Sequence, residues 1–221
     1  MATITVYGSV LSPFVARVLL TCGYKGLASE LSMPKDGIKS PEFLKLNPFG
    51  KIPTIKDSGT VLYESTVIVD YLDAKYKKKK LIPAAAKAMG QARLIAAISA
   101  EYVQAAGLKF FRMKRANQNI PADIEAATLE LTKGLDVLEK IMSGKKYAAG
   151  PSVTIADCFA VPALFFAVHA SALYGMKDAI GSRKKLRAYW ERMHKDKVAG
   201  KILQGMSDRM KQLLAGSWSS P

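Results

Sequence analysis

The sequence predicts an α+β domain followed by an all-α domain. Up to about residue 76, short runs in which apolar and polar residues alternate are followed in turn by segments with apolar residues at helical spacing. After residue 84, every long segment has helical spacing. Between them lie Lys77–Lys80 and the sequence Leu-Ile-Pro, which is typical of an extended, solvated connection. A contact with nucleic acid or lipid is the alternative use of these lysines. We expect a first domain over residues 1–78, a linker over 79–87 and a helical domain over 88–221.

The elements of the first part are predicted from side-chain periodicity. Alternation predicts strands, and spacings of three and four predict helices. The sequence Asp57-Ser58-Gly59 has the residues that a tight hairpin turn prefers. The resulting order, β-α-β-(α)-β-β-α, is typical of a small α+β sheet domain. The expected elements are a strand at Ile4 and Val6, a helix from Val15 to about Gly23, a strand from Leu27 to Met33, two strands within residues 51–64 and a helix from Thr66 to Tyr76.

Three apolar stripes at helical spacing mark the second part. In addition, Thr154 and Asp157 have the spacing of a helix N-terminal capping box, ahead of the apolar run Cys158–Val168. Pro162 removes one backbone donor from this run, so we expect a kink there. The stripes are Leu94, Ile98, Tyr102, Ala105, Leu108 and Phe111, then Ile124, Thr128, Leu131, Leu135, Leu138 and Met142, and last Ile202, Met206, Met210 and Leu213.

Composition excludes several classes of protein. With 49% hydrophobic and 23% charged residues among 221, the chain is not disordered and has enough apolar side chains for a sizeable core. Its two cysteines cannot form a disulfide framework and suit a reducing compartment, so we expect a cytoplasmic protein. Neither a secretion signal nor a membrane span is expected. His169 and His194 have no cysteine or carboxylate at ligand spacing, so no metal is expected.

The net charge is unusual, because 33 basic and 18 acidic residues give +15. Such an excess attracts polyanions, anionic lipid or acidic small molecules, and does not choose among them. The basic residues are spread along the chain and lack interleaved aromatic residues. We therefore expect no nucleic-acid partner.

Three short motifs each allow a structural and a functional interpretation. Ser12-Pro13 is typical of a helix start, and its hydroxyl could instead stabilise a bound thiolate in the positive potential of that helix. Ile52-Pro53 is an ordinary edge-strand proline or, if cis, exposes the Ile52 backbone to an extended ligand. Glu64-Ser65 either caps a helix or holds the zwitterionic end of an amino acid.

These motifs, in this order, carry a resemblance to a known family. They are Ser12-Pro13-Phe14 with Arg17-Val18, then Asn47–Pro53, Leu62–Ser65 and Thr154–Asp157. Over essentially its whole length the chain resembles the cytosolic glutathione transferases, in particular the serine-type members of phi-, tau- or theta-like or bacterial classes. The resemblance implies a thioredoxin-like N-terminal domain, an all-helical C-terminal domain and glutathione as co-substrate.

The resemblance also implies roles for single residues. Ser12 would donate a hydrogen bond to the glutathione sulfur and favour the thiolate, with Ser9 and Tyr7 as rivals for this role. Arg17 and Asp157 would be structural, Arg17 at a helix surface or domain contact. The implied glutathione-binding residues are Ser12 for the sulfur, Ile52 with cis Pro53 for the cysteinyl backbone, Glu64 and Ser65 for the γ-glutamyl end, and Lys39 and Lys51 for the glycyl carboxylate.

A second set of residues is implied for the electrophile. Arg112 and Arg115 could attract an acidic substrate, although a solvated helix surface is the alternative. The implied lining residues are Val10 and Leu11 of the first loop and Tyr102, Phe110, Phe111 and Met113 of the helical domain, each of which could instead be ordinary core.

The expected function is therefore transfer of glutathione, held as thiolate by Ser12, to a hydrophobic electrophile, or use of the same thiolate for peroxide reduction or ether or halide cleavage. Related proteins with Cys-Pro-Phe reduce thiols, and Ser12 in place of that cysteine disfavours such chemistry. The isomerase branch has a Ser-Ser-Cys-type motif that this sequence lacks. The alternative is a non-catalytic protein of the same fold that binds acidic hydrophobic ligands. Members of the family are usually dimers, so a homodimer is expected.

Overall fold

The computed structural model describes residues 3–216, which form two compact units. The first unit runs to Leu81 and includes the segment from Lys197 onward, and the second is Ile82–Asp196. This division differs from the expected one in its last helix, α9 (Lys197–Leu214), which packs against the first helix of the first unit. The apolar stripe of α9 is explained by this contact.

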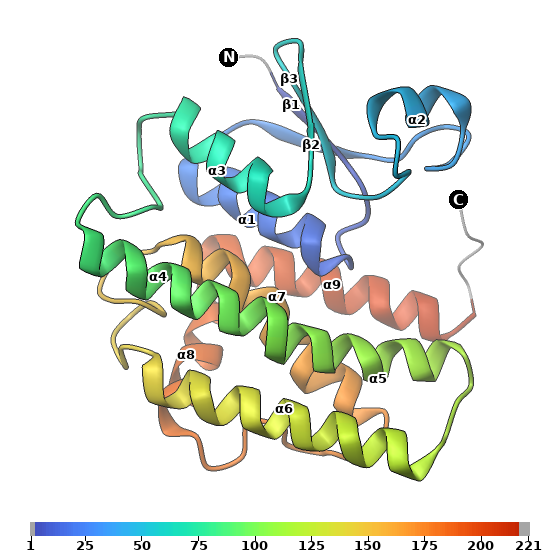
Figure 1. Ribbon diagram of the computed structural model, residues 1–221, viewed down its shortest axis with the longest axis vertical. Helices are drawn as coiled ribbons and strands as arrows, with labels where there is room; N and C mark the ends of the chain where they lie inside the picture. The colour runs from blue at the N-terminus through green and yellow to red at the C-terminus, as the bar shows by residue number, and fades with distance from the viewer. Residues whose placement is uncertain (1–2, 217–221) are drawn as a thin grey trace. The chain divides into compact units, whose positions relative to one another are not determined.

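The first unit contains a four-stranded sheet of order β2-β1-β3-β4 (Figure 1). Strand β1 pairs parallel with β2 and antiparallel with β3, and β3 pairs antiparallel with β4. The expected order of elements and the thioredoxin-like fold are confirmed, including the hairpin at Asp57-Ser58-Gly59. The elements are β1 (Ile4–Tyr7), α1 (Pro13–Lys25), β2 (Ser29–Ser32), α2 (Pro41–Leu46), β3 (Thr54–Asp57), β4 (Thr60–Tyr63) and α3 (Ser65–Lys75).

Helix α1 continues past Gly23, where an end was expected, to Lys25. Gly26, at φ 69°, ends the helix in the left-handed conformation that glycine adopts easily. Gly23 has a different purpose, because a Cβ there would lie 2.5 Å from Cγ1 of Val198 in α9. The glycine therefore marks a close helix–helix approach inside the first unit and not a helix terminus.

The core of the first unit lies between the sheet and helices α1 and α3. Apolar residues alternate along β1, and residues three or four apart face them from α1 and α3, as the two periodicities require. The buried cluster consists of Ile4, Val6, Val15, Val18, Cys22, Ile55, Ile68 and Leu72.

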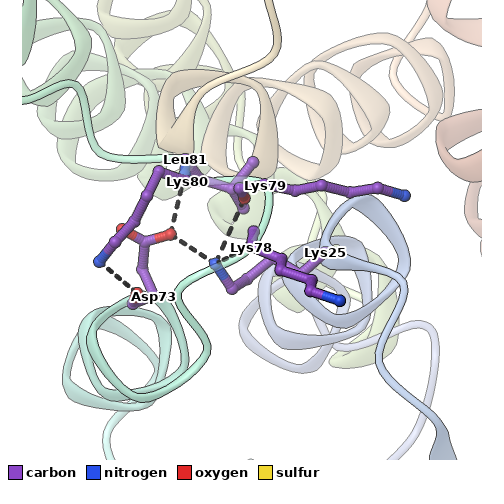
Figure 2. Close-up of polar contacts among 6 residues, drawn as sticks. All are labelled: Lys25, Asp73, Lys78, Lys79, Lys80 and Leu81. Carbon is purple, nitrogen blue, oxygen red and sulfur yellow. Dashed lines mark hydrogen bonds and ion pairs between the residues drawn. The ribbon is translucent and has the colours of Figure 1, made fainter.

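A buried ion pair fixes the tetralysine segment to the first unit (Figure 2). The Lys25 Nζ of α1 lies 2.8 Å from Oδ1 of Asp73 in α3, and neither side chain is accessible to solvent beyond 1%. Lys25 also donates to the carbonyls of Lys78 and Lys79, and Asp73 accepts from the backbone N–H of Leu81 at 2.8 Å. The expectation of a merely solvated linker was therefore wrong for Lys78–Leu81, whose backbone is anchored although the lysine side chains are exposed.

The second unit is entirely helical in its regular structure, as expected (Figure 1). Helix α7 lies at its centre and is buried along nearly its whole length. Thr154 and Asp157 form the predicted capping box, with Asp157 Oδ2 accepting from the Thr154 N–H at 2.8 Å. The helical assignment of α7 continues through Pro162. The elements are α4 (Ala86–Ile98), the π-helical η1 (Ser99–Gln104), α5 (Ala105–Arg115), α6 (Pro121–Ile141), α7 (Ile155–Ala172) and α8 (Lys184–Lys195).

The first of the three predicted stripes was wrong. Leu94 and Tyr102 are 45% and 54% exposed, whereas Ile95 and Val103, one position later, are fully buried. The buried positions keep helical spacing through the π-helical segment η1, as Ile95, Ser99, Val103, Ala106, Phe110 and Met113. The expected stripe therefore had the right period and lay one residue away from the buried face. In α5, a Cβ on Gly107 would lie 2.9 Å from the backbone of Phe166, so this glycine allows α5 and α7 to pack closely.

Two helical stretches have the length and composition of a membrane span, namely Ala86–Arg115 and Ile155–Ala172. Within α7, 83% of the apolar window is buried inside the protein. The hydrophobicity of α7 is thus accounted for by its place at the centre of the helical unit.

Candidate glutathione site in the first unit

Ser12 begins α1 and has the geometry of an N-cap. Its Oγ accepts from the backbone N–H of Val15 at 3.4 Å, and Pro13 occupies the first helical position. The structural interpretation of this motif is therefore confirmed. A serine hydroxyl has one hydrogen to donate as well, and among residues 3–216 the Ser12 hydroxyl has no acceptor for it. Capping of α1 thus leaves the Ser12 hydroxyl able to donate to a ligand.

The two rivals of Ser12 lie on the same side of the first unit. Ser9 Oγ accepts from the Leu11 N–H at 3.4 Å in the loop between β1 and α1. Tyr7, the last residue of β1, packs its ring edge-to-face against Phe43 with centroids 5.6 Å apart. Tyr7 thus has a packing role within the unit that Ser12 does not have.

The Ile52–Pro53 peptide bond is cis, and it precedes β3. The N–H and C=O of Ile52 have no hydrogen-bond partner within the described chain, residues 3–216. They are available to an extended, peptide-like ligand that pairs with them as a strand would.

Asn47, to which the sequence assigned no role, holds this loop in place. Its buried Nδ2 donates to the Lys51 carbonyl at 2.9 Å and to Thr54 Oγ1 at 3.1 Å, and its Oδ1 accepts from Phe49 N–H. These bonds fix the backbone on either side of Ile52. The Asn-Pro-Phe-Gly sequence, read as a turn-former with an internal side-chain acceptor, would have indicated this role.

Lys39 and Lys51 come together around Phe49. The Lys39 Nζ donates to the Phe49 carbonyl at 3.0 Å, and the Lys51 Nζ lies 5.8 Å from the centre of the Phe49 ring. Both lysines are exposed. The structure therefore places two cations beside the loop that carries Ile52.

Glu64 and Ser65 begin α3, but Ser65 does not cap it. Glu64 is the N-cap residue, at the unusual φ of 66°, and it makes no side-chain capping bond. The capping interpretation was therefore wrong, and the N–H groups of Ser65, Thr66 and Val67 have no partner in the part of the chain that the structure describes. Free N–H groups at a helix N-terminus favour an anion.

Ser65 accepts a hydrogen bond from Arg17, which was expected at a helix surface or domain contact. The helix-surface alternative was wrong, because Arg17 is 3% exposed and its Nη1 lies 3.2 Å from Ser65 Oγ. Burial lowers the pKa of Arg17 to about 10, so the guanidinium is still charged at neutral pH. No local pattern indicated this contact, since 48 positions separate the two residues.

The sheet register brings the three motifs to one end of the first unit. Tyr7 of β1 pairs with Thr54 of β3, which pairs with Tyr63 of β4. The segment that leads to Ser12 follows β1, Ile52 precedes β3 and Glu64 follows β4, so all three lie at the same end of the sheet. A Cβ on Gly8 would lie 3.3 Å from Cβ of Ile52, so the first and second motifs are in close contact.

Comparison with known proteins agrees with this arrangement. The profile for the glutathione S-transferase N-terminal domain matches residues 6–80, and the profile for the C-terminal domain of the same proteins matches residues 121–192.

The chain belongs to the glutathione S-transferase family.

Among its relatives is glutathione S-transferase 3 of Zea mays, 35% identical over 206 residues, which cover 86% of this chain and 89% of the maize protein. Poplar glutathione transferase F1 is 26% identical and shares the fold with a TM-score of 0.78, over 94% of this chain and all of the poplar chain. Glutathione S-transferase I, solved with lactoylglutathione, shares the fold at 22% identity with a TM-score of 0.78, over 92% of this chain and all of the other.

In this glutathione S-transferase, the residues expected at the electrophile lie in both units. In the first unit, Leu11 is buried, and Val10 is partly buried, since a Cβ on Gly205 of α9 would lie 3.3 Å from its Cγ2. In the second unit, Tyr102 of η1 is exposed.

The other three residues expected at the electrophile are buried in the helical unit. The Phe110 ring lies 5.8 Å from that of Tyr174, and the Phe111 ring lies 5.4 Å from that of Phe166. These two side chains contribute to core packing. Met113 lines a cavity of about 390 Å³ between α5 and α6, and Arg112 lies on the same wall.

The cysteines of this glutathione S-transferase are poorly placed for thiol chemistry. Cys22 and Cys158 are buried and form no disulfide within residues 3–216, and burial raises the pKa of Cys22 to about 12. Such a thiol is protonated at neutral pH and is a weak nucleophile. Among residues 3–216, no three His, Cys, Asp or Glu side chains gather in a way that could hold a metal ion.

Proposed function

We propose that this chain activates glutathione as a thiolate at Ser12 and transfers it to a hydrophobic electrophile. The observation that carries the proposal is the row Tyr7–Thr54–Tyr63, which brings a free hydroxyl, a free backbone and a helix N-terminus to one end of the sheet. These three features suit the thiol, the cysteinyl backbone and the γ-glutamyl carboxylate of one tripeptide. Lys39 and Lys51 supply charge for its glycyl carboxylate.

The chemistry requires that the thiol be ionised near neutral pH. An ordinary thiol has a pKa of about 8.5, and each unit of lowering requires about 1.4 kcal/mol of preferential stabilisation of the thiolate. One hydrogen bond from Ser12 to the sulfur, with the α1 N-terminus behind it, supplies about two units. Ser12 in this role stabilises the nucleophile and is not itself the nucleophile.

Binding at Glu64 and Ser65 is tested by calorimetry with glutathione and by conjugation of a chromogenic aryl halide. We expect Glu64→Ala and Ser65→Ala each to weaken glutathione binding about tenfold, because each removes a polar contact to a charged group worth about 1.5 kcal/mol. Glu42→Ala and Ser58→Ala are matched controls, since both residues are exposed elsewhere in the first unit. Normal affinity in both site variants would contradict the placement of the γ-glutamyl end.

The same assays separate the transferase from a non-catalytic binding protein. The latter predicts tight binding of an anionic dye with negligible turnover of any electrophile, and its motivation is the net charge of +15. Efficient conjugation by the unchanged protein would exclude it. A panel with a hydroperoxide, an aryl ether and an alkyl halide decides which reaction the thiolate serves. For the electrophile, we keep Val10 and Tyr102 as proposed contacts, because both retain accessible surface.

We also propose that the protein is a homodimer. Each unit exposes large apolar side chains, including Phe49 and Val67 in the first and Leu94 in the second. Removing exposed apolar side chains from water favours association. Sedimentation velocity is expected to show a dimer that Leu94→Glu dissociates and that Leu129→Glu, an exposed leucine of α6, leaves intact. A monomer in the unchanged protein would refute the proposal.

The cytoplasmic location is likewise a proposal. It is supported by the two buried cysteines, which form no disulfide in the described part of the chain, because thiols stay reduced in the cytoplasm.

A further inference from the structure

Arg17 is a buried cation whose hydrogen bond leads to the proposed glutathione site. It lies in the second turn of α1, 3% exposed, with its guanidinium carbon 5.0 Å from the centre of the Phe14 ring. Its Nη1 donates to Oγ of Ser65, which is itself buried at the first position of α3. The positive charge of Arg17 therefore lies beside the N-terminus of α3, where three backbone N–H groups have no partner within residues 3–216.

The contact determines how Ser65 can bind anything else. A guanidinium has only donors, so the Ser65 oxygen must be the acceptor of this hydrogen bond. The hydroxyl hydrogen of Ser65 is then directed to another acceptor, and within residues 3–216 no group accepts it. An unassisted serine hydroxyl could equally accept a hydrogen bond from an ammonium or donate one to a carboxylate. The Arg17 guanidinium occupies one of the two lone pairs of Ser65 Oγ and repels an ammonium, so donation to a carboxylate is favoured.

We propose that Arg17 is a positioning residue that orients the Ser65 hydroxyl to donate and, with its positive charge, favours a carboxylate at the N-terminus of α3. The inference rests on the proposed function, in which that carboxylate is the α-carboxylate of the γ-glutamyl unit. Arg17 acts through Ser65 and does not touch the sulfur. Its loss therefore weakens binding of the γ-glutamyl end and leaves the reacting end unchanged.

The test is a double-mutant cycle on Arg17 and Ser65, read by calorimetry with glutathione and with cysteinylglycine, which lacks the γ-glutamyl unit. Arg17→Met keeps the apolar stem of the side chain and removes its charge and its hydrogen-bond donors. We expect it to raise the Kd for glutathione about tenfold and to leave the Kd for cysteinylglycine unchanged. In the Ser65→Ala background the same replacement should change the Kd for glutathione less than twofold, because its partner is already absent.

Kinetics distinguish positioning from general damage. At saturating glutathione, kcat of Arg17→Met should stay within about threefold while KM for glutathione rises about tenfold. Arg17→Lys should recover part of the affinity, since it restores a buried cation and donor. Thr21→Val is the matched control, because Thr21 is a fully buried residue one turn further along α1 whose hydroxyl donates to the Arg17 carbonyl and not to Ser65.

Several results would overturn the inference. An equal loss of affinity in the native and Ser65→Ala backgrounds, an equal loss for cysteinylglycine, or a fall in kcat without a rise in KM would each make Arg17 merely structural. If Arg17→Met does not fold, the cycle is run with Arg17→Lys. This variant is expected to raise the Kd for glutathione about threefold when Ser65 is present and to leave it unchanged in the Ser65→Ala background. Absence of glutathione binding by the unchanged protein would instead refute the proposed function, before any variant is compared.

Discussion

Replacement of Ser12 by alanine is expected to slow glutathione conjugation about 25-fold at pH 7 and hardly at all at pH 9. The size follows from a thiol pKa of about 6.5 with Ser12 and about 8.5 without it, which leaves about 3% of the bound glutathione as thiolate at pH 7 instead of about 76%. Because Ser12 lowers the pKa, its contribution is greatest below both values and disappears above them. The measurement is the pH profile of the rate with glutathione saturating.

A helix cap is lost in the same replacement, and a second variant accounts for it. Ser40 caps α2 as Ser12 caps α1, with its Oγ 3.3 Å from the Phe43 N–H, so Ser40→Ala also costs about 1 kcal/mol of stability. Only Ser12→Ala should move the pH profile, and Ser12→Thr should largely keep it. If Tyr7→Phe or Ser9→Ala moves the profile and Ser12→Ala does not, the thiolate belongs to that rival.

Removal of the buried carboxylate of Asp73 is expected to lower the free energy of unfolding by about 3–5 kcal/mol. Asp73→Ala leaves the Lys25 ammonium buried without its carboxylate partner and removes the acceptor for the Leu81 N–H (Figure 2). A buried charge deprived of its partner costs far more than a surface ion pair contributes. Urea unfolding followed by circular dichroism measures the difference.

The exposed pair Lys109–Glu130 provides the control for this prediction. Its two side chains are 48% and 51% exposed, so Glu130→Ala should change the free energy of unfolding by less than about 1 kcal/mol. Replacing both buried partners, as Lys25→Met with Asp73→Leu, should recover part of the loss, because no unpaired charge remains. A loss below 1 kcal/mol in Asp73→Ala would show that the buried pair is unimportant for stability.

Local patterns predicted the first unit well and long-range contacts poorly. The alternation at Ile4 and Val6, and the turn at Asp57-Ser58-Gly59, depend on neighbouring residues and were confirmed. The partnership of Arg17 and Ser65 depends on two helices far apart in the sequence, and nothing near either residue indicates it.

The same limit explains the errors in the helices. Gly23 was taken as a helix end because glycine often is one, but its reason is Val198, 175 positions later (198 − 23). The stripe through Leu94 and Tyr102 was placed one residue away from the buried face, which runs through Ile95 and Val103. Whether an apolar residue on a long helix is buried thus depends on which elements pack against the helix, and periodicity alone does not show this.

The place of α9 in the first unit has a consequence for biosynthesis. Gly23 and Val10 pack against α9, which follows them by more than 170 positions (Val198 and Gly205). On the ribosome, the segments that form the sheet emerge early, whereas the helix that covers this side of α1 emerges after the entire helical unit has been made. Of the two units, the one whose sheet emerges first is therefore completed after the other.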